Sequence, residues 1–375
     1  MKFSCIHMHR PGQLTFKRFG YQALQKKINR DFLNFKNVVF LKRLIILIKI
    51  MTRKAFKQMA SDIDAVITWV NGSSHQHTAS RKKFMAQSAS ALHENATNPH
   101  RWICNDEILF CLQSIHNFAP WTRRIWIVVD DETPDIKSLP IDLQQKITFA
   151  FHKQIFGKFV DFLPTFNSLA IESLLWKIDG ITEKFMYFND DVFLTSKLQP
   201  SDVFLNNKPV LRGTWSNYSS LVHNHQVKGD PAYFNHYMQI NAAAMEGFEA
   251  SKIFAAAHVV HPFTRSKMAA LFAKYQNEFI ENISYRFRDI KQFLPQSLYN
   301  HAAISEQNVI LSNETDHIHI HSGQGRDGCL ENTLITLEQI ITSNSIKFLC
   351  INDLPQLEIL IPNIRNLLSD AIGGF

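Results

Sequence analysis

Cysteine is scarce in this sequence, and no two cysteines are spaced as a metal or redox pair. The 375 residues include five cysteines, and no CxxC pair occurs. Because the number is also odd, we expect neither a disulfide framework nor a zinc site. Chains without disulfides are typical of reducing compartments, so we expect a cytoplasmic protein. The cysteines are Cys5, Cys104, Cys111, Cys329 and Cys350.

Long apolar runs are lacking as well. The most apolar stretch, residues 38–51, is interrupted by Lys42, Arg43 and Lys49. It is too short and too charged to span a bilayer, which requires about 20 mostly apolar residues. The first ten residues contain no apolar core and no small-residue cleavage site, so we expect no secretory signal there.

Acidic residues are nearly absent from residues 1–60, which hold fourteen Lys or Arg and only Asp31 as an acid. Their net charge is +13, whereas residues 61–375 carry −6. A basic arm is typical of contact with an anionic surface, either a membrane or a nucleic acid. We therefore predict two parts, a basic N-terminal arm over residues 1–60 and a folded domain over residues 61–375.

Apolar side chains are interspersed with the cations of this arm, as on an amphipathic interfacial helix. We favour peripheral contact with the inner face of the cell membrane and expect no nucleic-acid partner. The alternative is a helix packed on the protein body with its cations in solvent. The apolar positions are Phe32, Phe35, Val39, Leu44 and Leu47.

One stretch, residues 184–194, organises the rest of the chain. Its apolar and aromatic run predicts a buried strand, and the run ends abruptly in Asn189, Asp190 and Asp191. Polar groups at the end of a buried strand are costly unless they are paired or bind a ligand. Two adjacent carboxylates suit a divalent cation such as Mg²⁺, although the same residues also favour a turn.

Other predicted strands end in the same way. Residues 63–70 end at Asn71, residues 125–129 at Asp130 and Asp131, and residues 346–351 at Asn352 and Asp353. A further strand is predicted over residues 147–151. The intervening helical patterns, residues 108–118 and 168–178, indicate an α/β fold with a mostly parallel, Rossmann-like sheet. The carboxyl ends of such strands form a ligand crevice.

Four sequence blocks resemble those of the Stealth family. These proteins are sugar-1-phosphate transferases of bacterial capsule synthesis, related to the GlcNAc-1-phosphotransferase of animals. The blocks are residues 62–72 (DIDAVITWVNG), 101–194 (RWICNDEILF to KFMYFNDDVFL), 261–289 (HPFTRSKMAA to SYRFRD) and 347–353 (KFLCIND). The resemblance implies a nucleotide-sugar-transferase-like α/β core with a helical insertion.

The resemblance also implies a reaction. A hydroxyl of a growing capsular or cell-surface polysaccharide, or of an oligosaccharide, attacks the sugar-side phosphorus of a UDP-sugar. Hexose- or N-acetylhexosamine-1-phosphate is transferred as a phosphodiester and UMP leaves, with the capsule machinery as a partner. Two alternatives stay open: a metal-dependent glycosyltransferase that releases UDP, and a non-catalytic polysaccharide-binding protein.

Several residues of the matching blocks are expected at the site. Asp190 and Asp191 would hold Mg²⁺ or Mn²⁺, and Asp353 would be a third ligand or a general base. Arg288 would face the phosphoryl oxygens because a guanidinium can hold two of them. His261 would remove the acceptor proton, since imidazole titrates near neutral pH, or would donate a hydrogen bond to phosphate. Expected substrate contacts are Asp64, Asn71, Gly72, Arg101, Asn105, Asn167, Asn189 and Arg286.

Structural roles remain open for some of these residues. Asp64 could be structural, Asn105 could only begin a helix, and Asn167 could only cap one. His317, His319 and His321 alternate, so their side chains share one strand face and could bind a metal. For these histidines we favour a solvated or hydrogen-bonded face.

Overall fold

The chain divides into two units, Met1–Gln58 and Met59–Phe375. The computed structural model describes residues of the second unit, namely 63–88, 92–97, 102–103, 105–224, 227, 230–321 and 329–375. The predicted basic arm and Arg101 lie outside the described residues. The division of the chain into an arm and a catalytic domain stays a prediction.

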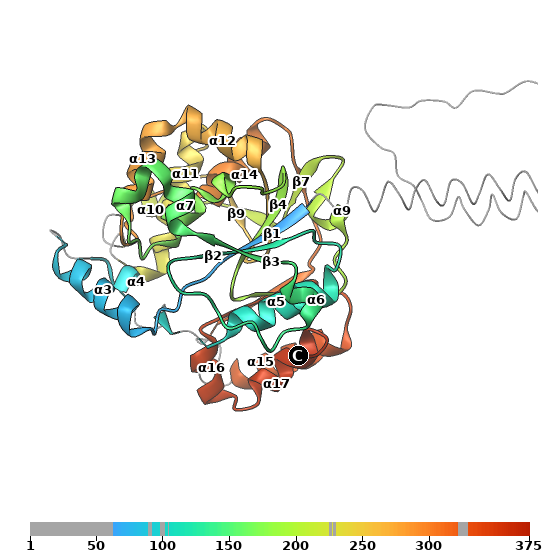
Figure 1. The fold of residues 1–375 in the computed structure, drawn as a ribbon. Helices are drawn as coiled ribbons and strands as arrows, with labels where there is room; N and C mark the ends of the chain where they lie inside the picture. Colours follow the sequence, from blue (N-terminus) through green and yellow to red (C-terminus); the bar gives the residue numbers. More distant parts are fainter. Residues whose placement is uncertain are drawn as a thin grey trace, which may run out of the picture. The chain divides into compact units, whose positions relative to one another are not determined.

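A five-stranded sheet in the order β10-β4-β1-β2-β3 forms the centre of the described unit (Figure 1). Strands β4, β1, β2 and β3 are parallel, and β10 is an antiparallel edge strand. This confirms the predicted α/β class with a mostly parallel sheet. The strands are β1 (Ile63–Thr68), β2 (Ile125–Val129), β3 (Ile147–Phe151), β4 (Lys184–Asn189) and β10 (His261–Thr264).

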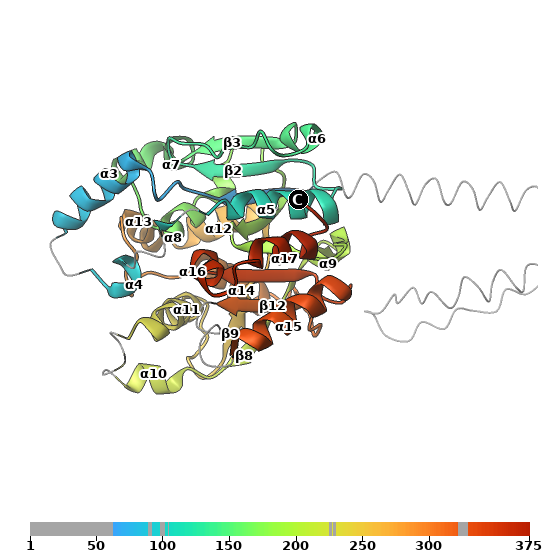
Figure 2. The same cartoon turned by 90° about the horizontal axis from the view of Figure 1, so that it is seen from below.

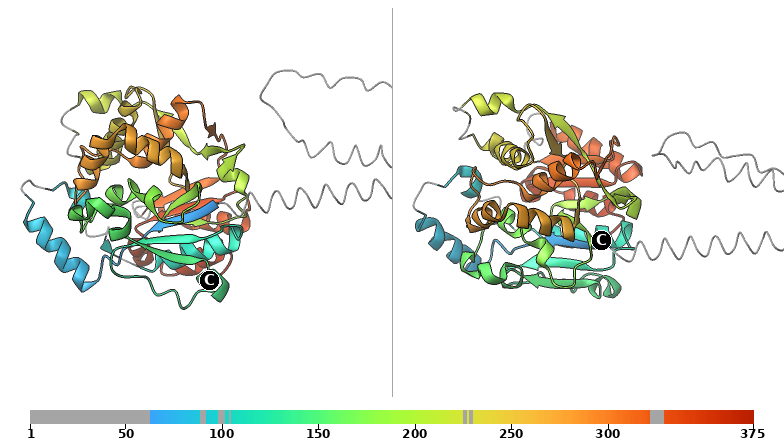
Figure 3. Two further views of the ribbon diagram at one scale, coloured as in Figure 1. Left: turned by 45° about the horizontal axis from the view of Figure 1, so that its top comes forward. Right: turned by 90° about the horizontal axis from the view of Figure 1, so that it is seen from above.

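Alternating side chains of β4 enter two different cores. Met186 and Phe188 pack on one face of the sheet, and Phe185 and Tyr187 pack on the other. Helices cover both faces (Figures 1 and 3), as expected for a parallel sheet whose strands are apolar throughout. On one face lie α5 (Glu107–Phe118), α6 (Ile141–Gln144), α15 (Cys329–Thr342), α16 (Leu354–Leu360) and α17 (Ile364–Ala371).

The opposite face is covered by helices from the middle of the chain. They are α7 (His152–Phe156), α8 (Ser168–Glu172), α12 (Arg265–Lys274), α13 (Gln276–Ser284) and α14 (Pro295–Ser305), with the 3₁₀ helices η2 (Gly157–Phe162) and η3 (Leu175–Lys177). The sequence pattern predicted a single helix over residues 168–178, which the structure breaks between Glu172 and Leu175. Tyr275, whose backbone leaves the helical region, separates α12 from α13.

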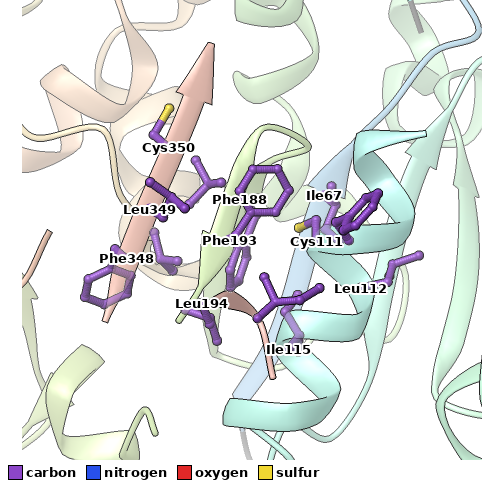
Figure 4. Close-up of a cluster of buried hydrophobic side chains, with 14 of the residues drawn as sticks. Ile67, Cys111, Leu112, Ile115, Phe188, Phe193, Leu194, Phe348, Leu349 and Cys350 are labelled. Atoms are coloured by element: carbon purple, nitrogen blue, oxygen red, sulfur yellow. The ribbon is translucent and has the colours of Figure 1, made fainter. Parts of the chain in front are cut away.

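A second sheet, in the order β12-β13-β5, begins where the first one ends. The chain leaves β4 at Asn189, turns through Asp190 and Asp191, and enters β5 (Val192–Leu194). β5 is antiparallel to β13 (Phe348–Asn352), which is parallel to β12 (His317–His321). Figure 4 shows Phe193, Leu349 and Cys350 of this sheet near Cys111 of α5 and Ile67 of β1. One core therefore joins the two sheets.

The remaining elements form an insertion between β5 and β12. Figure 2 shows α10 and α11 in this part of the unit, on the side of β8 and β9. The insertion is partly helical, as the resemblance implied, and it also contains short strands. Its elements are α9 (Pro200–Val203), β6 (Phe204–Leu205), β7 (Lys208–Leu211), β8 (Gly213–Ser216), α10 (Ser219–His223), η5 (Pro231–Tyr233), α11 (Phe234–Met245), β9 (Ile253–Ala256) and β11 (Ile310–Leu311).

Two short helices follow β1 on the amino side of α5. They are α3 (His75–Ala86) and α4 (Glu94–Thr97). Helix α5 begins at Glu107, one residue before the predicted helical pattern, and Ile108, Cys111, Leu112 and Ile115 form its buried stripe. None of the described helices has both the length and the apolar character needed to cross a membrane.

Candidate functional site

The carboxyl ends of the parallel strands meet at one edge of the central sheet, as the sequence predicted. Thr68 of β1 pairs in register with Asn189 of β4, so Asn71 and Asp190 follow adjacent strand ends. A cavity of about 300 Å³ opens at the same edge. Its lining comes from the segments after β1, β2 and β3: Val70, Asn71, Ser74, Gln76, His77, Ser80, Asp130, Asp131, Glu132, Lys153, Leu163, Pro164 and Phe166.

This cavity is rich in hydrogen-bond acceptors. Asn71 Nδ2 donates to Glu132 Oε2 at 2.9 Å, and Lys153 Nζ donates to Asp131 Oδ1 at 2.9 Å. Burial, reinforced by the neighbouring Asp131, raises the pKa of Asp130. Carboxylates grouped in this way accept hydrogen bonds from hydroxyl groups, so the cavity is suited to a ligand that presents hydroxyls.

Gly72 lies in a close backbone approach beside this cavity. A Cβ at this position would stand 2.6 Å from the carbonyl oxygen of Trp102, which leaves no room for a side chain. Ser73 Oγ donates to the same oxygen at 3.1 Å. The sequence predicted a close approach to a nucleotide, whereas the structure shows one to the Trp102 backbone.

The acid pair lies in the turn between β4 and β5. The Asp191 carbonyl oxygen accepts from Ile351 N at 3.0 Å, and its Oδ2 accepts a short hydrogen bond from Asn352 Nδ2. Burial raises the pKa of Asp190 well above its ordinary value, and the charges of Asp191 and Glu107 add to the effect. Carboxylates that raise one another's pKa repel, and a divalent cation would relieve that repulsion.

A hydrogen-bonded group from β4 and β1 adjoins the acids. Tyr187 Oη donates to Asn189 Oδ1 at 2.8 Å and lies 3.1 Å from Thr68 Oγ1. Burial raises the pKa of Tyr187 well above its ordinary value, and the negative charge of Glu172 adds to it. Asn189 is thus oriented by a buried phenol at the end of its own strand.

Arg288 is brought to the same place from the segment after α13. Its Nη2 donates to Ser168 Oγ at 2.6 Å. Burial lowers the pKa of Arg288, while Glu172, Tyr187 and Asp191 act in the opposite sense because they are close. Arg288 therefore lies within electrostatic range of Asp191, the second residue of the predicted acid pair.

His261 begins the edge strand β10 and pairs in register with Tyr187. The two ring centroids are 6.4 Å apart. Burial, followed by the nearby His258, lowers the pKa of His261 to about 3. The sequence argument relied on an imidazole that titrates near neutral pH, and the protein environment removes that property while keeping the ring neutral.

The surroundings of Asp64 favour the structural alternative over a substrate contact. Asp64 is the second residue of β1, near the end of the strand opposite the cavity, and its side chain is 0% exposed. Its carboxylate accepts from Arg123 Nε at 2.8 Å, from Arg123 Nη2 at 2.6 Å and from Trp126 Nε1 at 2.9 Å. A buried carboxylate with these partners is structural.

Asn105 and Asn167 also have structural partners. Asn105 Nδ2 donates to Glu358 Oε2 of α16, so it fastens the start of α5 to the C-terminal helices. Asn167 caps α8 by accepting from Leu169 N at 3.1 Å, and its Nδ2 donates to Tyr285 O and Gln292 Oε1, both at 2.9 Å. With both polar atoms of its side chain engaged, Asn167 holds the segment that carries Arg288, which favours its structural alternative.

Arg286 borders the cavity, whereas Asp353 lies at the start of α16. Arg286 Nη2 donates to the carbonyl oxygens of Asp161 and Leu163, at 3.0 and 3.2 Å, and its guanidinium lies 4.7 Å from the ring centroid of Phe84. It therefore borders the cavity, since Leu163 lines it. Asp353 follows β13 with a left-handed backbone, at the start of α16.

Sequence reasoning missed Glu107 and Tyr187 as members of this group. In the sequence alone, Glu107 is typical of the first turn of a helix, and Tyr187 belongs to an apolar strand run. The period-two alternation of β4 could have indicated that Tyr187 shares a face with Asn189. The proximity of Glu107 to Asp190 arises from packing of α5 on the sheet and has no local signal.

The fold and its edge together define a class: an α/β domain whose parallel strands end in an acidic, cavity-forming site. Two family models identify it further. Stealth protein CR1, conserved region 1, matches residues 61–89, and Stealth protein CR2, conserved region 2, matches residues 101–211. The chain contains these two Stealth regions, which confirms the predicted resemblance.

Curated relatives agree with these matches. An exopolysaccharide phosphotransferase of Streptomyces coelicolor is 34% identical over 64% of this chain and 38% of its own length. A capsular polysaccharide phosphotransferase of Actinobacillus suis is 39% identical over 42% of this chain and 41% of its own length. The chain thus spans about two fifths of the length of either relative.

Solved structures show only remote likeness. The galactosyltransferase LgtC, in complex with donor and acceptor sugar analogues, gives a TM-score of 0.37 at 13% identity, over 70% of this chain and 76% of that one. The bifunctional glycosyltransferase WbbM gives 0.38 at 14% identity, over 77% and 45%.

Proposed function

We propose that this protein transfers a hexose- or N-acetylhexosamine-1-phosphate from a UDP-sugar to a saccharide hydroxyl and releases UMP. The observation that carries the proposal is the electrostatic coupling of Arg288 to Asp191, whose neighbour Asp190 is coupled to it in turn, at the acidic edge of the sheet. Stealth regions 1 and 2, together with relatives named capsular and exopolysaccharide phosphotransferases, support a phosphoryl centre.

The proposed transfer is a single displacement at phosphorus, in which one bond forms and one bond breaks. The acceptor oxygen forms a bond to the phosphorus attached to the sugar, and the bond from that phosphorus to the bridging oxygen breaks. UMP leaves with the bridging oxygen, and the acceptor proton passes to a base. Because a transition state of this kind spreads negative charge over phosphoryl oxygens, catalysis depends mainly on positioning and on positive charge.

The acid pair fits a hard divalent cation. Asp190 and Asp191 offer carboxylate oxygens, the ligands that Mg²⁺ and Mn²⁺ prefer, and their mutual repulsion with Glu107 favours a cation. Such an ion, when bound by Asp190 and Asp191, would neutralise diphosphate charge. Asn352 orients Asp191 through its short hydrogen bond, so that carboxylate is fixed before any ligand arrives.

Side chains of this chain would supply the remaining steps. Arg288 is held by Ser168, and its planar guanidinium suits two phosphoryl oxygens. His261 is neutral, so its lone pair can accept the acceptor proton, and a bound phosphate would raise its low pKa. The acceptors that line the cavity, among them Asp130 and Glu132, would receive hydrogen bonds from donor hydroxyls.

The test is to identify the released nucleotide. The full chain is incubated with Mg²⁺, a panel of UDP-sugars and an oligosaccharide acceptor. We expect UMP, and a product with a new phosphodiester signal in ³¹P NMR. Release of UDP with no phosphorus in the product would replace the proposal with a glycosyltransferase, and no nucleotide release from any donor would favour a polysaccharide-binding protein.

Matched variants assign that activity to the acid pair. Asp190→Asn and Asp191→Asn should each abolish transfer, because loss of a metal ligand removes several kcal/mol of transition-state stabilisation. Asp135→Asn, an exposed acid paired only with Lys137, is the control and should keep full activity. EDTA should mimic the loss and Mg²⁺ or Mn²⁺ should reverse it. Undiminished transfer by both variants in EDTA would overturn the metal assignment.

A further inference from the structure

Three side chains outside the acid pair converge in the second sheet. His258, His319 and Cys350 each offer one ligand atom, and these atoms all lie within 4.8 Å of one another. The rings of His258 and His319 are stacked with centroids 4.1 Å apart. Two imidazoles and one thiol are the donor set found in zinc and other transition-metal sites.

The fold, and not the local sequence, creates this group. His319 lies on β12 and Cys350 on β13, and these two residues are register partners on neighbouring parallel strands. Side chains of register partners point to the same face of a sheet. His258 comes from the loop between β9 and β10, so three separate segments supply the three donors.

The ring of His319 is fixed by a second residue. Its Nε2 makes a short hydrogen bond with Asn352 Oδ1. Since the same amide donates through Nδ2 to Asp191, its Oδ1 is the acceptor and Nε2 of His319 carries the proton. The other nitrogen, Nδ1, then has the lone pair. Histidine ligands of metals commonly donate their second ring N–H to a carbonyl oxygen in this way.

The three donors differ in exposure. Cys350 is 1% exposed, and burial, with Asp191 and Asp190 adding to it, raises the pKa of its thiol well above the ordinary value, so an incoming cation must displace the thiol proton. His258 keeps an exposed face, through which an ion can enter.

We propose that His258, His319 and Cys350 bind a zinc ion that is separate from the cation of the acid pair. Three protein ligands leave a fourth position for water. The ion joins the β9–β10 loop to β12 and β13. Through His319 and Asn352 it also supports Asp191, so this site positions a residue of the proposed reaction without touching substrate.

The experiment uses Co²⁺ as a spectroscopic substitute for zinc. The full chain, first stripped with EDTA, is titrated with Co²⁺ alone. We expect one Co²⁺ ion per chain to give the visible spectrum of tetrahedral coordination. A thiolate-to-cobalt charge-transfer band should appear in the near ultraviolet, and added Zn²⁺ should abolish it. Cys350→Ala should lose the thiolate band, and His258→Ala, at an exposed position that tolerates truncation, should weaken Co²⁺ binding at least tenfold.

Three control variants separate this site from other ligands. His321→Ala removes a histidine of the same strand face, Cys111→Ala removes the other described buried thiol, and Asp190→Asn removes one carboxylate of the acid pair. All three should retain the thiolate band. Persistence of the band and of the affinity in both Cys350→Ala and His258→Ala would overturn the proposal, as would loss of the band in Asp190→Asn.

Discussion

At the scale of single residues, burial changes what a side chain can do. His261 and Arg288 were chosen from the sequence for their free properties, a pKa near neutrality and a permanent charge. In the protein, desolvation lowers the pKa of both. Arg288 keeps its charge because its ordinary pKa is so high, but His261 becomes neutral over the whole physiological range.

The low pKa of His261 predicts a distinctive pH profile. A general base must be unprotonated, so its contribution is present above its pKa and is lost as pH falls through about 3. The plot of kcat/KM for the donor against pH should therefore have the same shape near pH 6.5 in the wild type and in His261→Ala. If His261 is the general base, the substitution His261→Ala should lower kcat by about 10²–10⁴-fold. A fall in kcat/KM below pH 6.5 that occurs in the wild type and not in His261→Ala would contradict the low pKa of His261.

At the scale of elements, the segment after α13 depends on one amide. Asn167 both caps α8 and holds Tyr285 and Gln292, the residues that flank Arg286 and Arg288. Its role is therefore to join a helix start to a functional loop. The sequence argument recognised the possible cap but not the long-range partners, because residues more than a hundred positions away leave no local pattern.

Asn167→Ala should destabilise the protein by about 2–4 kcal/mol, from the lost cap and the buried groups left without partners. Urea unfolding measures this loss of stability. The stability of Asn167→Asp should lie between those of the wild type and Asn167→Ala, because aspartate keeps the capping oxygen. Donor KM should rise in parallel, since Arg288 loses its support. A raised KM with unchanged stability would instead restore Asn167 as a direct substrate contact.

A buried ion pair joins the insertion to the second sheet. Arg212, just after β7, donates to both oxygens of Asp316, just before β12, at 2.8 Å. Burial alone would raise the pKa of Asp316, but hydrogen bonds from His317 and Arg212 outweigh it and hold the pKa below the usual range. The pair therefore stabilises the fold above the unfolded pKa of about 3.9, and this contribution is lost as pH falls through the folded pKa.

Asp316→Asn should cost about 3–5 kcal/mol at pH 7, because Arg212 is left buried and unpaired. The difference from wild type, measured by urea unfolding, should shrink as pH falls below about 4. The exposed acid variant Asp135→Asn should change stability by less than about 0.5 kcal/mol. A pH-independent difference would mean that packing, and not charge, carries the effect.

Local pattern predicted those elements whose apolar residues are consecutive. β2 and β3 have the expected bounds, and α5 ends as expected at Phe118. The same reasoning placed the acid pair at a strand end but left the role of Asp64 undecided, because the type of a residue does not show at which end of a strand it lies or which partners it meets. For the alternating histidines His317, His319 and His321, the sequence analysis favoured a solvated or hydrogen-bonded face over metal binding. The partners of His319 come from β13 and from the β9–β10 loop, and only tertiary structure brings them together.

At the scale of the whole molecule, the charge asymmetry predicts a separable role for the basic arm. Deleting residues 1–55 should leave transfer to soluble acceptors intact and weaken binding to anionic vesicles. The loss should be larger at low salt, since charges are screened over about 10 Å at 0.1 M. Co-sedimentation measures it, with neutral vesicles as the control. Unchanged vesicle binding after deletion would assign the arm to protein contacts.

The docking of β13 against β5 has a consequence for synthesis of the protein. Asp191 is held by Ile351 and Asn352, so the acid pair takes its final geometry only after residue 352 is available. Chains fold from the amino end as they leave the ribosome. The first sheet and its cavity can form early, whereas Asp191 gains its partners only when β13 docks. Under the proposed reaction, a nascent chain that lacks β13 would therefore not yet act on the donor.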